Sequence, residues 1–419
     1  MTYKTFSLGC KVNSYETNAV STLLQQKGYV EDDNNPDVII INTCSVTQTA
    51  DQKSRQHIRK FKKLYPKAII VVMGCYSQKN HQFIKDEISP HIIIGTSNRS
   101  LIPSLIKKYL VDKKKIDLVE DNPRLFEYEE ISTHTLFNNV RAYLKIQDGC
   151  NNFCSYCLIP YLRGKMRSRD PSKVLLEAEE LVNKGYKEIV LTGIHVGGYG
   201  QDKNDIHFSD LVESLLNIKG LERLRISSIE ESEIDEKLIY LLKTRDNLAK
   251  HLHIPLQSGS DLILKLMNRK YNKEQFLSKI KYIKKECPTL AVTTDVITGF
   301  PYESEEEFNN TYNFIKECGF HMLHVFPFSP RSGTKAMKMD HQIDPVVKKE
   351  RATKLIDLSN QLWDEYLESY NNKPLSVLVE EYDEESDQYI GHSSNYIKVS
   401  FKSKTARIGE FSNVIYKKD

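Results

Sequence analysis

The sequence lacks the features that mark exported and membrane proteins. No run of about 18 apolar residues is present, so no transmembrane helix is predicted. The first residues, Met1 to Lys4, do not lead into the apolar stretch of a signal peptide. The net charge is only +3, so the overall charge does not indicate a nucleic-acid partner. Evidence for such a partner must come from local clusters of basic residues. We expect a cytoplasmic protein without membrane association.

The chain is long and contains several cysteines. Its 419 residues are enough for two or three domains with buried cores. In a reducing compartment, its eight cysteines favour metal binding or catalysis over disulfides.

Three cysteines, Cys150, Cys154 and Cys157, lie within eight residues. They follow the apolar run 141–146 and precede the basic segment 163–169. A 4Fe-4S cluster normally takes four thiolates, so a loop with three leaves one iron open for chemistry. A closed zinc site would need a fourth Cys or His at suitable spacing, and no His lies between Cys157 and His195.

Short apolar runs alternate with amphipathic segments over residues 1–112, which predicts an open, doubly wound α/β sheet. The predicted strands are 3–8, 38–42, 68–73 and 92–95. Cys10, Cys44 and Cys75 each follow a strand end, the edge where such sheets bind ligands. They form a second candidate three-thiolate site; the alternatives are buried apolar cysteines or a zinc site with three protein ligands.

Residues 113–138 are charged and polar and are predicted to be a linker. Over 139–370, six strands alternate with helices, too few for a closed eight-stranded barrel, so a partial (β/α)6 barrel is expected. The strands are 140–146, 188–192, 223–227, 251–255, 292–298 and 322–326. Short alternating runs in 371–419 predict a small antiparallel β domain, either OB-like and nucleic-acid-binding or a structural cap.

These motifs together resemble the radical S-adenosylmethionine (SAM) methylthiotransferases over nearly the whole chain. The C-x3-C-x2-C loop resembles the radical SAM signature, and Gly9-Cys10-Lys11-Val12-Asn13 resembles the branch that modifies N6-threonylcarbamoyladenosine in tRNA. The other matching segments are 42–44, 74–75, 159–169 and 294–301. One departure is Tyr302, where the family usually has glycine, and another is a C-terminal domain that is short for a TRAM domain.

The resemblance implies two 4Fe-4S clusters: a radical SAM cluster on Cys150, Cys154 and Cys157, and an auxiliary cluster on Cys10, Cys44 and Cys75. It implies SAM in two roles, as methyl donor and as source of a 5'-deoxyadenosyl radical. The methylthio group would enter at C2 of the adenine. Gly193, Ser228 and Gln257, which follow predicted barrel strands, are candidate SAM contacts.

The implied partners are a tRNA anticodon stem-loop, an electron donor such as flavodoxin or ferredoxin, and a sulfur donor. Phosphate contacts are expected from four basic side chains after the cluster loop: Arg163, Lys165, Arg167 and Arg169. Cys287 and Cys318 fall in helical patterns and are predicted to be structural.

Two alternatives remain open. The target could be isopentenyladenosine in tRNA or an aspartate of a ribosomal protein, both within the same family. The chain could also be a non-catalytic RNA-binding protein stabilised by zinc.

Overall fold

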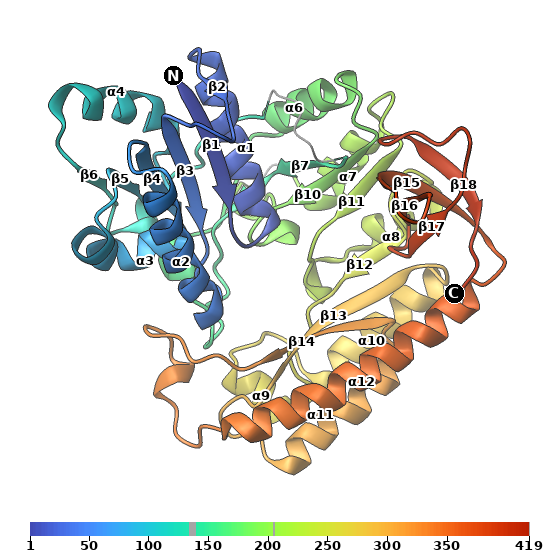
Figure 1. The fold of residues 1–419 in the computed structure, drawn as a ribbon. Helices are drawn as coiled ribbons and strands as arrows, with labels where there is room; N and C mark the ends of the chain where they lie inside the picture. Colours follow the sequence, from blue (N-terminus) through green and yellow to red (C-terminus); the bar gives the residue numbers. More distant parts are fainter. Residues whose placement is uncertain (134–139, 204–205, 419) are drawn as a thin grey trace.

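The computed structural model describes residues 1–133, 140–203 and 206–418. It is a mixed α/β protein with an N-terminal sheet, a central set of parallel strands and a C-terminal antiparallel sheet (Figure 1). None of the helices in these ranges is long and apolar enough to cross a membrane.

The N-terminal sheet is parallel, with strand order β2-β1-β3-β4-β5-β6. Alternate side chains of β3 point to opposite faces, which gives the sheet two apolar cores. Val38 and Ile40 pack in one core, and Ile39 and Ile41 in the other. The strands are β1 (Thr2–Ser7), β2 (Val30–Glu31), β3 (Val38–Thr43), β4 (Ile69–Gly74), β5 (Ile92–Ile94) and β6 (Ile116–Leu118).

Helices cover both faces of this sheet, so the predicted doubly wound arrangement is confirmed. Helices α1 (Lys11–Gln26) and α4 (Ile102–Asp112) contribute to one core, and α2 (Gln48–Leu64) and α3 (Cys75–Phe83) to the other. A π-helix, Ile84–Ile88, follows α3. Strand β6 lies in the segment predicted as a linker, so the sheet extends beyond residue 112; residues 134–139, which include the end of that linker, lie outside the described ranges.

The central region contains all six predicted parallel strands. They form two three-stranded sheets, β11-β10-β7 and β12-β13-β14, which isolated bridges such as Ser228 to His253 join. The array is an open partial barrel, as expected, because the sheets do not close on themselves. The strands are β7 (Ala142–Lys145), β10 (Glu188–Thr192), β11 (Arg223–Ile226), β12 (His251–His253), β13 (Ala291–Thr298) and β14 (Met322–Pro327).

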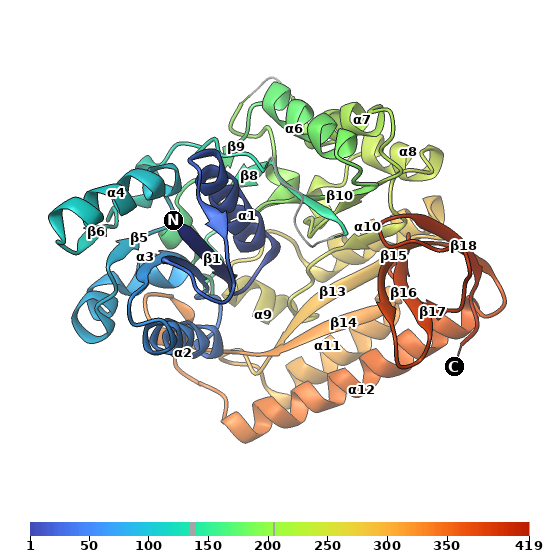
Figure 2. The ribbon, with the colours of Figure 1, turned by 45° about the horizontal axis from the view of Figure 1, so that its top comes forward.

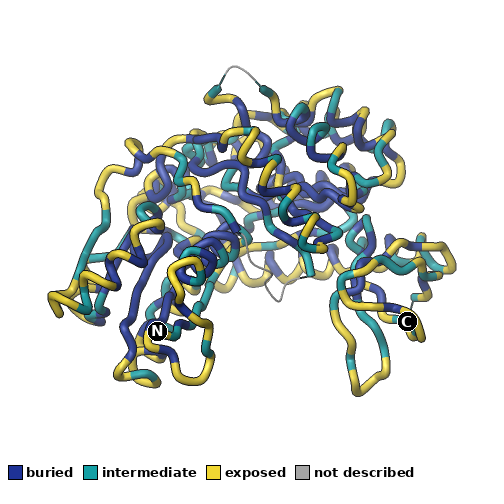
Figure 3. Tube along the Cα trace, turned by 90° about the horizontal axis from the view of Figure 1, so that it is seen from above, coloured by how far each residue is buried: buried dark blue, intermediate teal, exposed yellow. Residues whose placement is uncertain are grey.

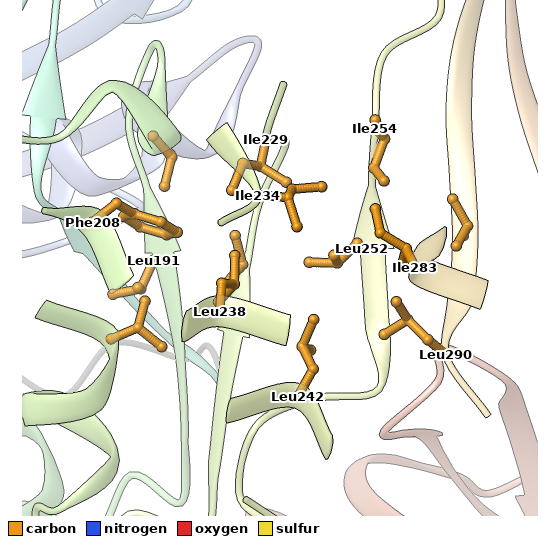
Figure 4. Packing of buried hydrophobic residues seen from close by; sticks show 14 of the residues in the cluster. Leu191, Phe208, Ile229, Ile234, Leu238, Leu242, Leu252, Ile254, Ile283 and Leu290 are labelled. Carbon is orange, nitrogen blue, oxygen red and sulfur yellow. The ribbon is translucent and has the colours of Figure 1, made fainter. Parts of the chain in front are cut away.

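Apolar helix faces pack against the outside of these strands. Figure 4 shows Leu238 and Leu242 of α8 close to Leu252 of β12, within the largest core cluster. Cys287 and Cys318 are buried in this cluster, in keeping with the structural role predicted for them. The helices are α6 (Pro171–Asn183), α7 (Phe208–Leu216), α8 (Glu236–Thr244), α10 (Lys273–Glu286), α11 (Glu305–Cys318) and α12 (Pro345–Ser369), with the shorter α5 (Ile159–Arg163) and α9 (Asp261–Leu266) and the two-residue strands β8 (Gln147–Asp148) and β9 (Arg167–Ser168).

The C-terminal sheet is antiparallel, with order β17-β16-β15-β18, and lies beside the barrel on the side away from the N-terminal sheet (Figure 2). Its strands are β15 (Pro374–Asp383), β16 (Gln388–Ser393), β17 (Lys398–Phe401) and β18 (Phe411–Ile415). Arg225 of the barrel donates to the carbonyl oxygens of Ser393 and Ser394, 3.1 Å each, which anchors the sheet. Its outer loops are exposed (Figure 3).

Candidate functional site

The loop that carries Cys150, Cys154 and Cys157 has a tightly fixed backbone. Gly149 has a φ of +72°, and a side chain there would overlap the carbonyl oxygen of Lys165. Phe153 is left-handed, with a φ of +48°. The amide of Asn268 donates to the carbonyl oxygens of Asn152 and Phe153, at 3.2 and 3.0 Å, and so stabilises this conformation.

Each sulfur of this loop has a donor directed at it. The backbone N–H groups of Asn152 and Ile159 lie 3.4 Å from the Sγ atoms of Cys150 and Cys157. The guanidinium of Arg269 lies 3.5 Å from Sγ of Cys154. Such donors suit the thiolates that act as cluster ligands, and they oppose the burial that raises the pKa of Cys157 to about 12. The surroundings therefore suit an iron–sulfur cluster.

Cys10, Cys44 and Cys75 lie together at the ends of three strands. Cys10 precedes α1 after β1, Cys44 follows β3, and Cys75 begins α3 directly after β4. Gly9 has a φ of +99°, and a Cβ there would lie 2.7 Å from Sγ of Cys44, so a side chain at this position would displace that thiol.

Two of these thiols are buried. The pKa of Cys44 is raised to about 12, mainly by burial and to a smaller extent by the nearby Cys75. Burial also raises the pKa of Cys75, although Arg163 opposes this from 3.4 Å, Nε to Sγ. Both shifts favour the thiol form, so metal binding at this triad would release protons. One arginine beside each cysteine triad, Arg163 here and Arg269 at the loop, is a shared feature.

The short helix α5 connects the two triads. It starts two residues after Cys157, and Leu158 and Leu162 pack directly against Cys75. Arg163, its last residue, contacts Cys75 as described. Cys75 of the strand-end triad therefore lies against the segment that directly follows Cys157 of the loop triad.

No group of three His, Cys, Asp or Glu side chains suited to a single metal ion is present in residues 1–133, 140–203 and 206–418. A cubane of four irons needs its ligands spread around a larger body. The fit of the loop cysteines therefore rests on the donor beside each sulfur, and among the strand-end cysteines Cys75 has such a donor.

The prediction that three arginines after the loop contact RNA is wrong. Arg163, Arg167 and Arg169 are at most 6% exposed, and carboxylates neutralise them. Arg169 pairs with Glu177 and Glu130, and Arg167 with Asp148. The fourth predicted residue, Lys165, is exposed, so its role as a phosphate contact stays a prediction.

Arg163 is the centre of a buried ion network between the first two domains. It lies 2.8 Å from Glu16 of α1 and 3.1 Å from Asp148. Glu16 also pairs with Arg99 at 2.8 Å and with Lys145 at 2.7 Å. Burial alone would raise the pKa of Glu16, but Arg163, Arg99 and Lys145 together lower it to about 2.

A cavity of about 930 Å³ lies inside the partial barrel and reaches both flanking domains. The barrel contributes His253, Asp295 and His324, and Tyr396 comes from the C-terminal domain. Lys11, adjacent to Cys10, contributes from the N-terminal domain. Apart from Ser228, these lining residues were not predicted from the sequence; the alternation of His251 and His253 along one strand was the available signal.

The three candidate SAM contacts are spread over the barrel. Ser228 lines the large cavity. Gln257 is buried after β12 with a φ of +65°, and Gly193 follows β10 beside Gln147. A smaller cavity of about 170 Å³ adjoins Cys154, His195 and Arg269. None of the three residues lines that cavity, and their role as SAM contacts stays a prediction.

Comparison with known proteins agrees with this geometry. The Radical SAM superfamily model matches residues 144–315, and that of Uncharacterized protein family UPF0004 matches residues 2–95. Among solved structures, the radical SAM methyltransferase TsrM from Kitasatospora setae has a TM-score of 0.61 at 12% identity, covering 80% of this chain and 77% of that one. That likeness shows a shared fold. The central domain and its cysteine loop are those of a radical SAM enzyme, a class that uses a 4Fe-4S cluster and SAM.

Relatives match over almost the full length. The chain is 47% identical to the threonylcarbamoyladenosine tRNA methylthiotransferase MtaB of Bacillus subtilis, covering 97% of this chain and 92% of that protein. It is 39% identical to MtaB of Aquifex aeolicus, covering 89% and 91%. A tRNA-2-methylthio-N(6)-dimethylallyladenosine synthase of Thermoanaerobacter sp. is 36% identical, covering 98% and 89%. The chain therefore belongs to the radical SAM methylthiotransferase family and is a transferase.

Proposed function

We propose that the protein inserts a methylthio group at C2 of N6-threonylcarbamoyladenosine beside the tRNA anticodon. The observation that carries the proposal is the contact of Cys75 with Leu158, Leu162 and Arg163, in the segment that directly follows the Cys150–Cys157 loop. The identity of 47% to a relative with that named activity, against 36% to one named for dimethylallyladenosine, supports this nucleoside.

Cys150, Cys154 and Cys157 hold the radical SAM cluster in this proposal, and Cys10, Cys44 and Cys75 hold an auxiliary 4Fe-4S cluster. When bound, the clusters supply the electron for reductive cleavage of SAM and the sulfur for insertion. SAM acts both as the source of the 5'-deoxyadenosyl radical and as the methyl donor. The C2–H bond of adenine is not acidic, so a radical step replaces acid–base catalysis.

The protein's own residues position the reactants and exclude water. Arg163 and Arg269 place a positive charge 3.4 and 3.5 Å from the sulfurs of Cys75 and Cys154. The cavity lined by Lys11, the residue after Cys10, admits a base from a single-stranded anticodon loop, the kind of RNA whose bases can be turned outward. An electron donor such as flavodoxin or ferredoxin and a separate sulfur donor are needed as partners.

Comparing tRNA nucleosides tests the proposal. Deleting the gene should remove 2-methylthio-N6-threonylcarbamoyladenosine from tRNA hydrolysates, as measured by mass spectrometry, and the intact gene should restore it. A gene carrying Cys154→Ala should not. An unchanged nucleoside profile would reject the tRNA substrate, and loss of the dimethylallyl product alone would indicate the other nucleoside.

Metal analysis tests the cofactors separately. Anaerobic reconstitution should give about eight irons per chain if two 4Fe-4S clusters form. Bound zinc without broad visible absorption would instead favour a zinc-stabilised RNA-binding protein.

A further inference from the structure

We propose that Lys11 forms an anion subsite that binds the carboxylate of the amino-acid group on N6 of the target adenine. The inference rests on the proposed function, because it names the part of the substrate that the cavity recognises. In this inference, Lys11 is the residue that distinguishes a substrate with a charged N6 group from one with an uncharged N6 group.

Lys11 presents its charge to the large cavity. It is half-buried, begins α1 directly after Cys10, and lines the cavity with His251 and His324. Burial is the main cause of the lowered pKa of His324, and the positive charge of Lys11 is one of the smaller causes. Lys11 and His324 therefore lie near each other. Within the described ranges, no hydrogen bond or ion pair engages the Lys11 ammonium.

No salt bridge joins Lys11 to either carboxylate among the described residues that line the cavity. Asp295 lies 3.1 Å from His253, and Asp364 lies 2.7 Å from Lys418. These are the two carboxylates among the described lining residues. Lys398 adds a further cation from the C-terminal domain. The cavity therefore has an excess of positive charge, and an anion is the ligand that fits it.

The position of Lys11 favours a carboxylate over a phosphate of the RNA. In adenine, C2 and C6 both flank N1, so a substituent on N6 lies along the same edge as the reacting C2. If Cys10 helps to hold the sulfur that C2 receives, the residue after Cys10 lies next to that edge. The sugar and its phosphates are on the opposite side of the base, nearer the wall that carries Lys398 in this orientation.

Binding measurements on the reconstituted full chain test the inference. Three anticodon stem-loops differ only at N6 of the target adenosine: threonylcarbamoyl, dimethylallyl or unmodified. Fluorescence anisotropy gives the Kd of each for the wild type, Lys11→Met, Lys11→Arg and Lys398→Met. Iron content and the thermal midpoint show whether each variant folds and binds its clusters like the wild type.

We expect the wild type to prefer the threonylcarbamoyl stem-loop, and Lys11→Met to reduce that preference by about tenfold, the effect of losing one hydrogen bond to a charged group. Lys11→Arg should keep most of the preference. Lys398→Met should weaken all three complexes alike, because a phosphate contact does not depend on the N6 group.

Three results would overturn the inference: no preference in the wild type, an unchanged preference in Lys11→Met, or equal weakening of all three complexes by Lys11→Met, which would mark Lys11 as a phosphate contact. Failure of the proposed function looks different. In that case the wild-type enzyme, supplied with SAM and reductant, forms no methylthio product on the threonylcarbamoyl stem-loop.

Discussion

The two cysteine triads are built in opposite ways. Cys150, Cys154 and Cys157 come from one loop, held by neighbours of the same domain such as Asn268 and Arg269. Cys10, Cys44 and Cys75 come from three strand ends separated by more than 30 residues each, and an arginine of another domain contacts the last of them. One triad therefore depends on local backbone geometry and the other on tertiary assembly.

Because of this difference, we expect substitutions near the two triads to affect the clusters differently. Changes near the loop should act on one cluster, because the supporting contacts are short-range. Changes at the domain interface should act on the strand-end triad first, because Arg163 contacts both Cys75 and the carboxylates that join the domains.

The largest expected effect separates the chemical roles of the triads. Cys154→Ala should abolish both the methylthio product and 5'-deoxyadenosine, because the radical SAM cluster is lost. Cys75→Ala should abolish the methylthio product yet still release 5'-deoxyadenosine from SAM. Each variant should retain about four irons per chain, one cluster of the two. Liquid chromatography of both products and an iron assay check this, and loss of 5'-deoxyadenosine in Cys75→Ala despite four bound irons would contradict separate roles.

The second-largest expected effect concerns the buried ion network around Arg163. Arg163→Met should lower the free energy of unfolding by about 3–5 kcal/mol, because Glu16 and Asp148 would each lose a buried partner. Urea denaturation monitored by circular dichroism measures the change. Lys165→Met is the matched control: it is exposed, and its effect should stay within about 0.5 kcal/mol. Equal effects of the two substitutions would show that the network does not stabilise the fold.

Acid should weaken the same interface. The pKa of Glu16 is about 2 in the folded protein against an ordinary value of 4.5, so its stabilising contribution is present above about pH 4.5 and is lost as the pH falls toward 2. The shift corresponds to about 3 kcal/mol. Urea midpoints between pH 7 and pH 3 should fall for the wild type and change less for Glu16→Gln. Parallel curves for the two proteins would show that Glu16 does not cause the pH dependence of stability.

The sequence predicted the strands well because they depend on short patterns, whereas cluster binding by the two triads stays a prediction. Short apolar runs indicated the strands, and each cysteine of the N-terminal triad followed one of them. The burial of Arg163, Arg167 and Arg169 was not predictable in this way. A basic cluster looks the same whether it faces RNA or carboxylates, and the partners Glu16 and Arg163 are 147 residues apart.

Tyr302 shows a similar limit. The sequence departs from the family pattern there, with tyrosine in place of the usual glycine. The structure gives Tyr302 a φ of +69°, a conformation that favours glycine, and its ring lies 4.6 Å from that of His341. The contact with a residue 39 positions away could not be read from the local pattern.

The smallest expected effect tests the local support of the loop triad. Asn268→Ala removes two hydrogen bonds to the loop and places alanine at a φ of +60°, so we expect a loss of about 1–2 kcal/mol in the free energy of unfolding. Asn268→Gly is the matched control, since it removes the same bonds but tolerates the backbone conformation. Both should speed the loss of iron from the loop cluster to a chelator, and Cys75→Ala, which retains that cluster alone, is the background in which to measure it. If neither variant changes the rate there, the loop holds its geometry without Asn268, and the contrast between local and assembled triads must rest on the cysteines alone.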